Sequence, residues 1–95
     1  SAVRRFILYP NFPNPFNSKT YFKYEIPIGI RVRIEVFNVL GRKLKTLVDE
    51  DKEAGFYTVY WDGIDDQGRN VVSGIYFYHM STNKFNMTHK MIVVR

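Results

Sequence analysis

The chain has 95 residues, enough for one domain with a single core, and no apolar run in it approaches the roughly 20 residues of a membrane-spanning helix. Hydrophobic residues make up 45% of the chain and aromatic residues 17%, which favours β-strands, and the lack of cysteine excludes disulfides and cysteine-based metal sites. The formal charge of +5 comes from bases scattered along the sequence, which argues against nucleic-acid binding.

Residues 1–19 are predicted to be an entry segment rich in proline and asparagine. A short apolar run at residues 6–9 is followed by alternating Pro and Asn residues. Proline fixes φ and asparagine side chains hydrogen-bond to nearby backbone, so residues 10–18 are expected to cross one end of the fold in an ordered conformation. Phe12 and Phe16 are expected to hold this segment against the core.

The body of the domain, residues 20–95, begins with two stretches in which apolar and polar residues alternate, the period of a half-buried strand. Gly41 is expected to reverse the chain after the second stretch because glycine takes positive φ at no steric cost, and a strand over residues 42–48 follows. Residues 49–55 are strongly charged and are expected to form a solvated loop. The side chains predicted to face the core are Phe22, Tyr24, Ile26, Val32, Ile34 and Val36.

Three further strands are predicted in the second half of the chain. Residues 56–61 alternate and end at Trp61, the single tryptophan, on the inward face. After a connection rich in turn residues, strands over 74–80 and about 85–94 follow; in the first of these, either the tyrosines Tyr76 and Tyr78 or their neighbours face outward. About seven short strands without any helical period predict an all-β fold, an antiparallel two-sheet Ig-like or fibronectin-III-like β-sandwich.

Two groups of residues invite a metal-binding interpretation. Asp62, Asp65 and Asp66 lie among glycines, but their spacing does not follow an EF-hand, and Asx-turns that support a connection between strands are favoured. His79 and His89 lie on neighbouring predicted strands and could face each other, yet two histidines without a third ligand make a weak zinc site. We therefore predict no metal and no cofactor.

Catalytic arrangements are not evident in the sequence. The serines lie in predicted turns without a Gly-flanked nucleophile motif, and the carboxylates fall on predicted solvent faces or in the charged loop. The chain is therefore predicted not to be an enzyme. Exposed aromatic residues such as Tyr21 could stack on sugar rings, although a small sandwich needs most of its aromatic residues for the core.

The last six residues place four apolar side chains between two basic ones, in the order Lys90, Met91, Ile92, Val93, Val94, Arg95. A final strand can be recognised by strand addition, in which backbone hydrogen bonds supply affinity and alternate side chains supply selectivity. This tail is the strongest candidate for a functional element. Other distinctive motifs precede it, at residues 9–17, 36–42, 61–63 and 73–78.

The order of these motifs resembles the C-terminal sorting domains of the type IX (Por) secretion system over nearly the whole chain, and residues 55–78 also look like the Ig-like domain of the flagellar hook-capping protein. The resemblance implies that residues 1–95 are a single domain of a larger exported protein, with the tail as sorting signal. It implies a supporting motif as well, made up of Gly74, Tyr76, Gly41, Pro13, Asn14 and Pro15.

The function implied by this resemblance is a non-catalytic module that directs an N-terminally attached cargo protein through the bacterial outer membrane. The expected partners are the outer-membrane translocon and a sortase-like peptidase, with no nucleic acid, and the domain is expected to be a monomer. The expected location is the periplasm during transit, then the cell surface or the extracellular space. The alternative is an accessory Ig-like module that packs on or extends an extracellular hydrolase and contacts carbohydrate.

Overall fold

The computed structural model describes residues 4–95, and these residues form seven strands joined by turns and irregular connections. The strands alternate buried and exposed side chains because successive side chains of a strand point to opposite faces. Their bounds are β1 (Ile7–Leu8), β2 (Thr20–Ile26), β3 (Ile30–Phe37), β4 (Lys43–Lys52), β5 (Gly55–Trp61), β6 (Gly74–Ser81) and β7 (Asn86–Val93).

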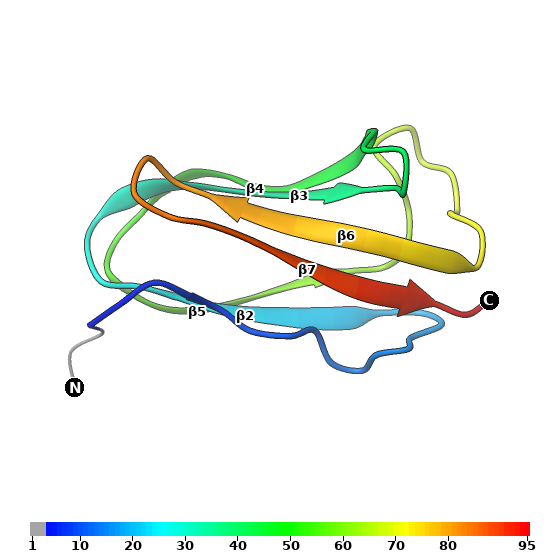
Figure 1. Ribbon diagram of the computed structural model, residues 1–95, viewed down its shortest axis with the longest axis horizontal. Coiled ribbons are helices and arrows are strands. Elements are labelled where there is room, and N and C mark those ends of the chain that lie inside the picture. The colour runs from blue at the N-terminus through cyan, green and yellow to red at the C-terminus, as the bar shows by residue number, and fades with distance from the viewer. Residues whose placement is uncertain (1–3) are drawn as a thin grey trace.

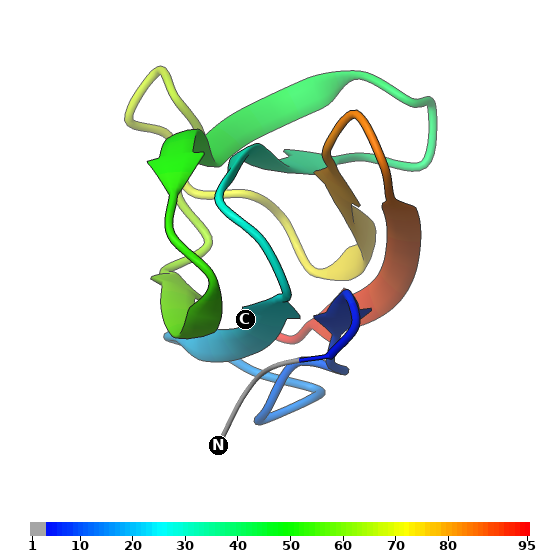
Figure 2. The ribbon, with the colours of Figure 1, turned by 90° about the vertical axis from the view of Figure 1, so that its left-hand side faces the viewer.

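The strands form two sheets packed face to face, as Figures 1 and 2 show. One sheet has the order β1-β2-β5 and the other the order β4-β3-β6-β7, and all neighbouring strands pair antiparallel. This arrangement confirms the predicted all-β, two-sheet Ig-like sandwich of seven strands. The described residues contain no helix that could cross a membrane.

Side chains from both sheets interdigitate in one core. All six inward residues predicted on β2 and β3 are buried, and Tyr76 and Tyr78 face inward, which leaves Ile75 on the outer face. Trp61 is 1% exposed, and its ring meets the rings of Phe16 and Tyr76 edge-on at centroid distances of 5.9 and 6.0 Å. The predicted inward position of Trp61 is thus confirmed.

The prediction of a loop over residues 49–55 is wrong, because β4 continues to Lys52 and β5 begins at Gly55. Cross-strand charge pairing explains the difference. The Arg31 side chain donates from Nε to Oδ1 of Asp49 at 3.1 Å, and Arg33 lies opposite Asp49 in the register. Opposite charges on neighbouring strands stabilise pairing, so this charged stretch extends the sheet instead of leaving it.

The entry segment contributes both to a sheet and to the core. It contains β1, and Phe16 is buried as predicted. The expectation that Phe12 packs on the core is wrong, since its ring is 78% exposed. The backbones of Phe12 and Tyr21 exchange two hydrogen bonds, of 3.0 and 2.9 Å, and directly paired residues share a face, so Phe12 lies on the outer face with Tyr21.

Candidate functional site

The tail forms the end of β7, the edge strand of the four-stranded sheet. Met91 and Val93 point into the core and are buried, while Lys90 and Val94 are exposed and Ile92 is half-buried. The period of two therefore divides the predicted signal into an inner row that holds the strand and an outer row that solvent can reach.

The outer edge of this strand is not free at its end. Residues 14–17, here called the covering segment, lie beside it, and Phe16 forms a parallel bridge with Val93. The N–H of Phe16 donates to the carbonyl of Ile92 at 3.0 Å, and the N–H of Val94 donates to the carbonyl of Phe16 at 2.8 Å. The Asn14 side-chain oxygen accepts the N–H of Ile92 at 2.9 Å. Another strand cannot pair with the edge there while the covering segment is in place.

The remainder of β7 has a different edge. Ile92 directs its N–H and C=O away from β6. The backbone groups of every second residue along a strand point to the same side, so the outer edge also carries those of Lys90, Thr88 and Asn86. Beside this part lies β1, whose Leu8 carbonyl is bonded to Nε2 of His89 at 2.7 Å. This part of β7 is therefore linked to β1 of the opposite sheet by the His89 side chain and not by backbone hydrogen bonds between the two strands.

Arg95 is bonded to two connections of the fold, the one between β5 and β6 and the one between β1 and β2. Its N–H donates to the hydroxyl of Ser73 at 2.8 Å. The guanidinium donates to the carbonyls of Val71, Asn17 and Gly63, at 3.0, 3.2 and 2.6 Å. A guanidinium has five N–H donors in a rigid fork, so one side chain can serve three acceptors. The sequence carried no sign of this arrangement, because the acceptors are backbone groups.

The predicted supporting residues fall into two groups. Asn14 bonds to the tail directly, and Gly74 and Tyr76 lie on β6 opposite Val93 and Met91. Pro13 and Pro15 line a shallow open hollow of about 420 Å³ together with Val94. Gly41 instead forms the turn between β3 and β4, where its N–H donates to the carbonyl of Asn38.

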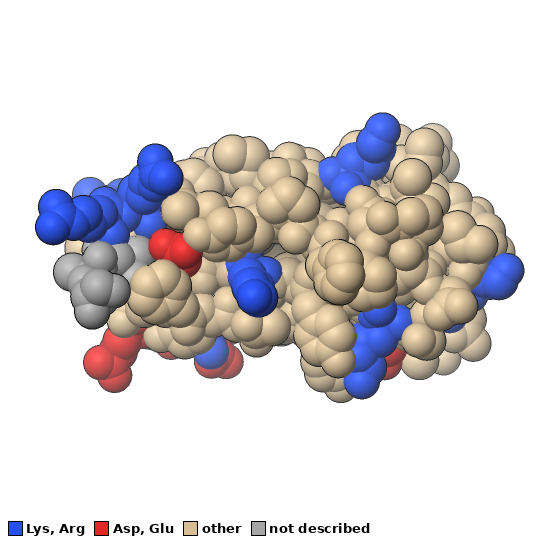
Figure 3. Space-filling model, turned by 90° about the horizontal axis from the view of Figure 1, so that it is seen from below, with Lys and Arg blue, Asp and Glu red and all other residues tan. Residues whose placement is uncertain are grey.

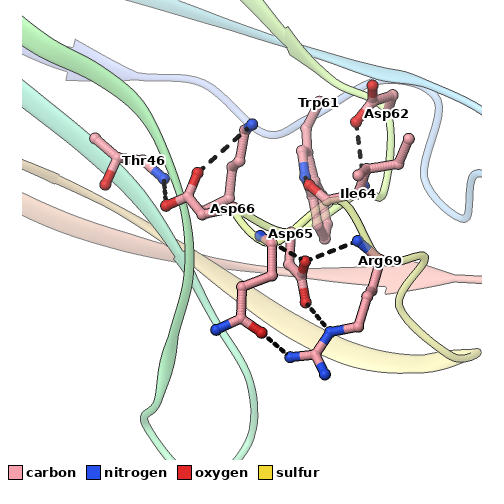
Figure 4. A network of polar contacts seen from close by, with 9 residues as sticks. Thr46, Trp61, Asp62, Ile64, Asp65, Asp66 and Arg69 are labelled. Carbon is pink, nitrogen blue, oxygen red and sulfur yellow. Dashed lines mark hydrogen bonds and ion pairs between the residues drawn. The ribbon is translucent and has the colours of Figure 1, made fainter.

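In the aspartate-rich connection after β5, Asp62 and Asp65 form the predicted Asx-turns, whereas the Asp66 carboxylate accepts the N–H of Thr46 on β4 at 3.2 Å (Figure 4). Asp62 accepts the N–H of Ile64 at 3.1 Å, and Asp65 accepts the N–H groups of Gln67 and Arg69, both at 2.9 Å. These backbone donors, that of Arg69 foremost, hold the pKa of the Asp65 carboxyl below its usual range. Each carboxylate is directed at its own backbone partner, and the three do not share a centre.

The expectation that the two histidines could face each other is wrong. His79 pairs with Thr88 in the register and His89 pairs with Tyr78, a one-position offset that places the two rings on opposite faces of the sheet. The His79 ring contacts the Thr88 hydroxyl at 2.6 Å. Across residues 4–95, no group of three or more His, Cys, Asp or Glu side chains is arranged to hold a metal ion.

The comparisons with known proteins agree with this architecture. The model of the FlgD Ig-like domain matches residues 16–85, a match that ends before β7 begins. No curated protein gives a significant match.

Two solved structures from Porphyromonas gingivalis have a similar fold. Dimeric latent PorU is 21% identical with a TM-score of 0.76, and the match covers 97% of this chain and 10% of that one. PorZ, described as an essential bacterial surface component of the type-IX secretion system, is 18% identical with a TM-score of 0.61, and the match covers 95% of this chain and 11% of that one. The chain thus spans about a tenth of the length of either protein.

Proposed function

Because the chain belongs to the family of FlgD Ig-like domains, we propose that it is a non-catalytic sorting module that directs an attached protein through the outer membrane by type IX secretion. The fold it shares with PorZ, a component of that system, supports the link. The observation that carries the proposal is the tail itself, the last part of the edge strand β7 and the residues after it, which presents Lys90, Ile92 and Val94 outward on a buried support.

The way in which the tail is recognised follows from its two rows. Met91 and Val93 anchor the strand in the core, and Arg95 anchors its end through three carbonyls. A partner that meets the folded domain therefore contacts the outer row, Lys90, Ile92 and Val94. Strand addition at Ile92 and Val94 would first require release of the covering segment, which occupies their backbone groups.

The proposed cargo, partners and location follow from this function. The cargo is attached at the N-terminal side, and the partners are the outer-membrane translocon and a sortase-like peptidase. The module passes through the periplasm and reaches the cell surface or the extracellular space as a monomer.

The test is a fusion of a signal peptide, a reporter protein and residues 1–95, expressed in a bacterium with an active type IX system. We expect the reporter outside the outer membrane in this strain and in the periplasm of a strain in which the system is disabled. Export in the disabled strain would contradict the proposal.

A double variant of the outer row, Lys90→Ala with Ile92→Ser, keeps the buried row and Arg95 intact. We expect it to leave the reporter in the periplasm while the thermal unfolding midpoint of the isolated domain stays close to that of the wild type. The matched control is Lys84→Ala with Met87→Ser, two exposed residues just before the tail, which we expect to be exported. Export of the outer-row variant at the wild-type level would refute recognition of the folded tail.

A further inference from the structure

The outer surface of the β1-β2-β5 sheet carries several large aromatic side chains that are exposed and do not pack in the core. Phe12 is 78% exposed, Phe56 62%, Tyr60 50% and Tyr21 45%. Tyr21 and Tyr60 are directly opposite in the register of β2 and β5, with ring centroids 6.3 Å apart. Single exposed apolar residues are ordinary, but several large rings on one face indicate a binding surface. We call this surface the aromatic face; Figure 3 views the molecule from this side.

A hollow of about 940 Å³ opens on the aromatic face, near the upper end of the range known for ligand sites. One of its walls is the ring of Phe12, whose backbone is fixed to β2 by the two hydrogen bonds with Tyr21. Because this backbone is fixed before binding, only the side-chain torsions of Phe12 lose conformational freedom on contact with a ligand. The lining residues used in the argument are Tyr9, Phe12, Tyr21, Lys23, Glu25 and Thr58.

Polar groups cross the centre of the aromatic face. Lys23 lies opposite Thr58 in the register, and the next outward residue of β2 is Glu25. The phenol of Tyr9 donates a hydrogen bond to the Glu25 carboxylate, and this bond raises the pKa of Tyr9. Within residues 4–95, neither Lys23 nor Glu25 forms an ion pair, so the hollow itself holds one charge of each sign. A second positive charge lies on the same face, because Nζ of Lys19 is 4.5 Å from the centroid of the outward Tyr60 ring.

This central row of polar groups helps to decide whether the aromatic face binds a protein or a sugar. The buried core of a protein–protein interface is depleted in charged residues, whereas the centre of the aromatic face holds Lys23 and Glu25. A sugar suits both features, because a pyranose ring has an apolar C–H surface for aromatic rings and hydroxyl groups around its edge for polar ones. Two lysines, Lys19 and Lys23, lie on this face with one glutamate, and the domain has a net charge of +5, so a sugar that carries a carboxylate is favoured over a neutral one.

We propose that the aromatic face binds an acidic oligosaccharide, a short chain of uronic-acid units. The rings of Tyr21 and Phe12 stack on the C–H surfaces of the sugars, the Lys23 ammonium pairs with a sugar carboxylate, and Glu25 and Thr58 bond to hydroxyl groups. The site is on the opposite sheet from the tail and does not depend on the sorting function.

The test is isothermal titration of residues 1–95 with tetragalacturonic acid, and with its methyl ester as a neutral ligand of the same backbone. We expect saturable binding of the acid and binding of the ester weaker by about fivefold, since a close charge pair outside the core is worth up to about 1 kcal/mol. Tyr21→Ala and Phe12→Ala should each weaken binding of the acid by about two- to tenfold. Lys23→Gln should remove the preference for the acid over the ester.

The matched control variants are Leu40→Ala, an exposed apolar residue in the β3–β4 turn, and Lys84→Gln, an exposed lysine in the β6–β7 loop. Both should bind the acid as the wild type does, and circular dichroism should show that every variant is folded. Absence of binding to the acid, or equal weakening by the controls, would overturn the proposal. Sedimentation that shows a dimer dispersed by Phe12→Ala would also overturn it, because the face would then be an interface between copies of the chain.

Discussion

Gly63 provides the space that the Arg95 side chain fills. A Cβ atom at Gly63 would overlap Nη2 of Arg95, and that same nitrogen donates a hydrogen bond to the Gly63 carbonyl at 2.6 Å. Gly63 has φ of +75°, in the region that residues with a side chain rarely adopt. The final residue of the chain is thus part of the fold, and a function assigned to the tail has to be separated from its structural role.

The first prediction concerns the stability that Arg95 supplies. Arg95→Met keeps much of the aliphatic side chain but removes the bonds to the carbonyls of Val71, Asn17 and Gly63. We expect the free energy of unfolding to fall by about 1–3 kcal/mol, because three hydrogen bonds to a charged group are lost and the partly buried carbonyl of Val71 is left without a partner. The Gly63 carbonyl still accepts the N–H of Val71. Urea denaturation measures the change. A loss below about 0.5 kcal/mol would mean that water replaces the guanidinium without cost.

The second prediction separates backbone strain from the contact with Arg95. Gly63→Ala and Gly68→Ala both place a Cβ at positive φ, +75° and +80°, but only the first meets another group, since nothing lies within 4 Å of a Cβ at Gly68. Each should lose about 1–2 kcal/mol from strain, and Gly63→Ala should lose more. In an Arg95→Met background the two alanine variants should become equal in cost. A double-mutant cycle measures this, and full additivity would contradict it.

The third prediction concerns the centre of the core. Trp61→Ala should lower the free energy of unfolding by about 3–5 kcal/mol, because it leaves a cavity between Phe16 and Tyr76. Trp61→Phe should cost less, since the phenyl ring fills part of the site and chiefly the bond from Nε1 to the Ile64 carbonyl, 2.9 Å long, is lost. Chemical denaturation of both variants gives the comparison, and an alanine variant within about 0.5 kcal/mol of the wild type would show that the core adapts to the loss.

Alternation of apolar residues was sufficient to predict the strands and their inward faces. Val32, Ile34 and Val36 lie where the period of two puts them, because the pattern that defines a strand also defines its buried face. The charged end of β4 was not predictable in this way. Asp49 belongs to a strand because of Arg31 and Arg33 on β3, and one segment read alone does not reveal a partner across a sheet.

The candidate site was only partly predictable for a similar reason. The composition of the tail identified Lys90 and Ile92 as notable, and the Pro/Asn-rich segment identified Asn14. The bond between Asn14 and Ile92 joins residues that are 78 positions apart, and no local pattern encodes that distance. The acceptors of the Arg95 guanidinium are carbonyls, which every residue has, so residue type could not mark them.

The fourth prediction tests the covering segment by hydrogen exchange. The amides of Ile92 and Val94 should exchange slowly, because they donate to Asn14 and Phe16, whereas the amide of Lys90 faces the open part of the edge and should exchange faster. Asn14→Ala should speed exchange at Ile92 specifically. A variant in which Ile92 stays as protected as in the wild type would show that the Asn14 side chain does not cover that amide in solution.

The last prediction is a dependence of stability on pH that comes from Asp65. The backbone N–H groups of Arg69 and Gln67 and the charge of Arg69 lower the pKa of this carboxyl in the folded state, below the value of about 3.9 usual for an unfolded chain. A depressed folded-state pKa adds stability above the unfolded pKa, and this stability is lost as the pH falls through the folded pKa.

Asp65→Asn keeps an oxygen that can accept both N–H groups and removes the charge. We therefore expect the variant to be less stable than the wild type at about pH 7, with a difference that shrinks as the pH falls below about 4. Denaturation curves across this range measure it, with Asp51→Asn on the exposed end of β4 as the control for loss of one negative charge. A difference that stays constant from neutral to acid pH, or grows toward acid, would show that the carboxylate charge does not stabilise the turn between Asp65 and Arg69.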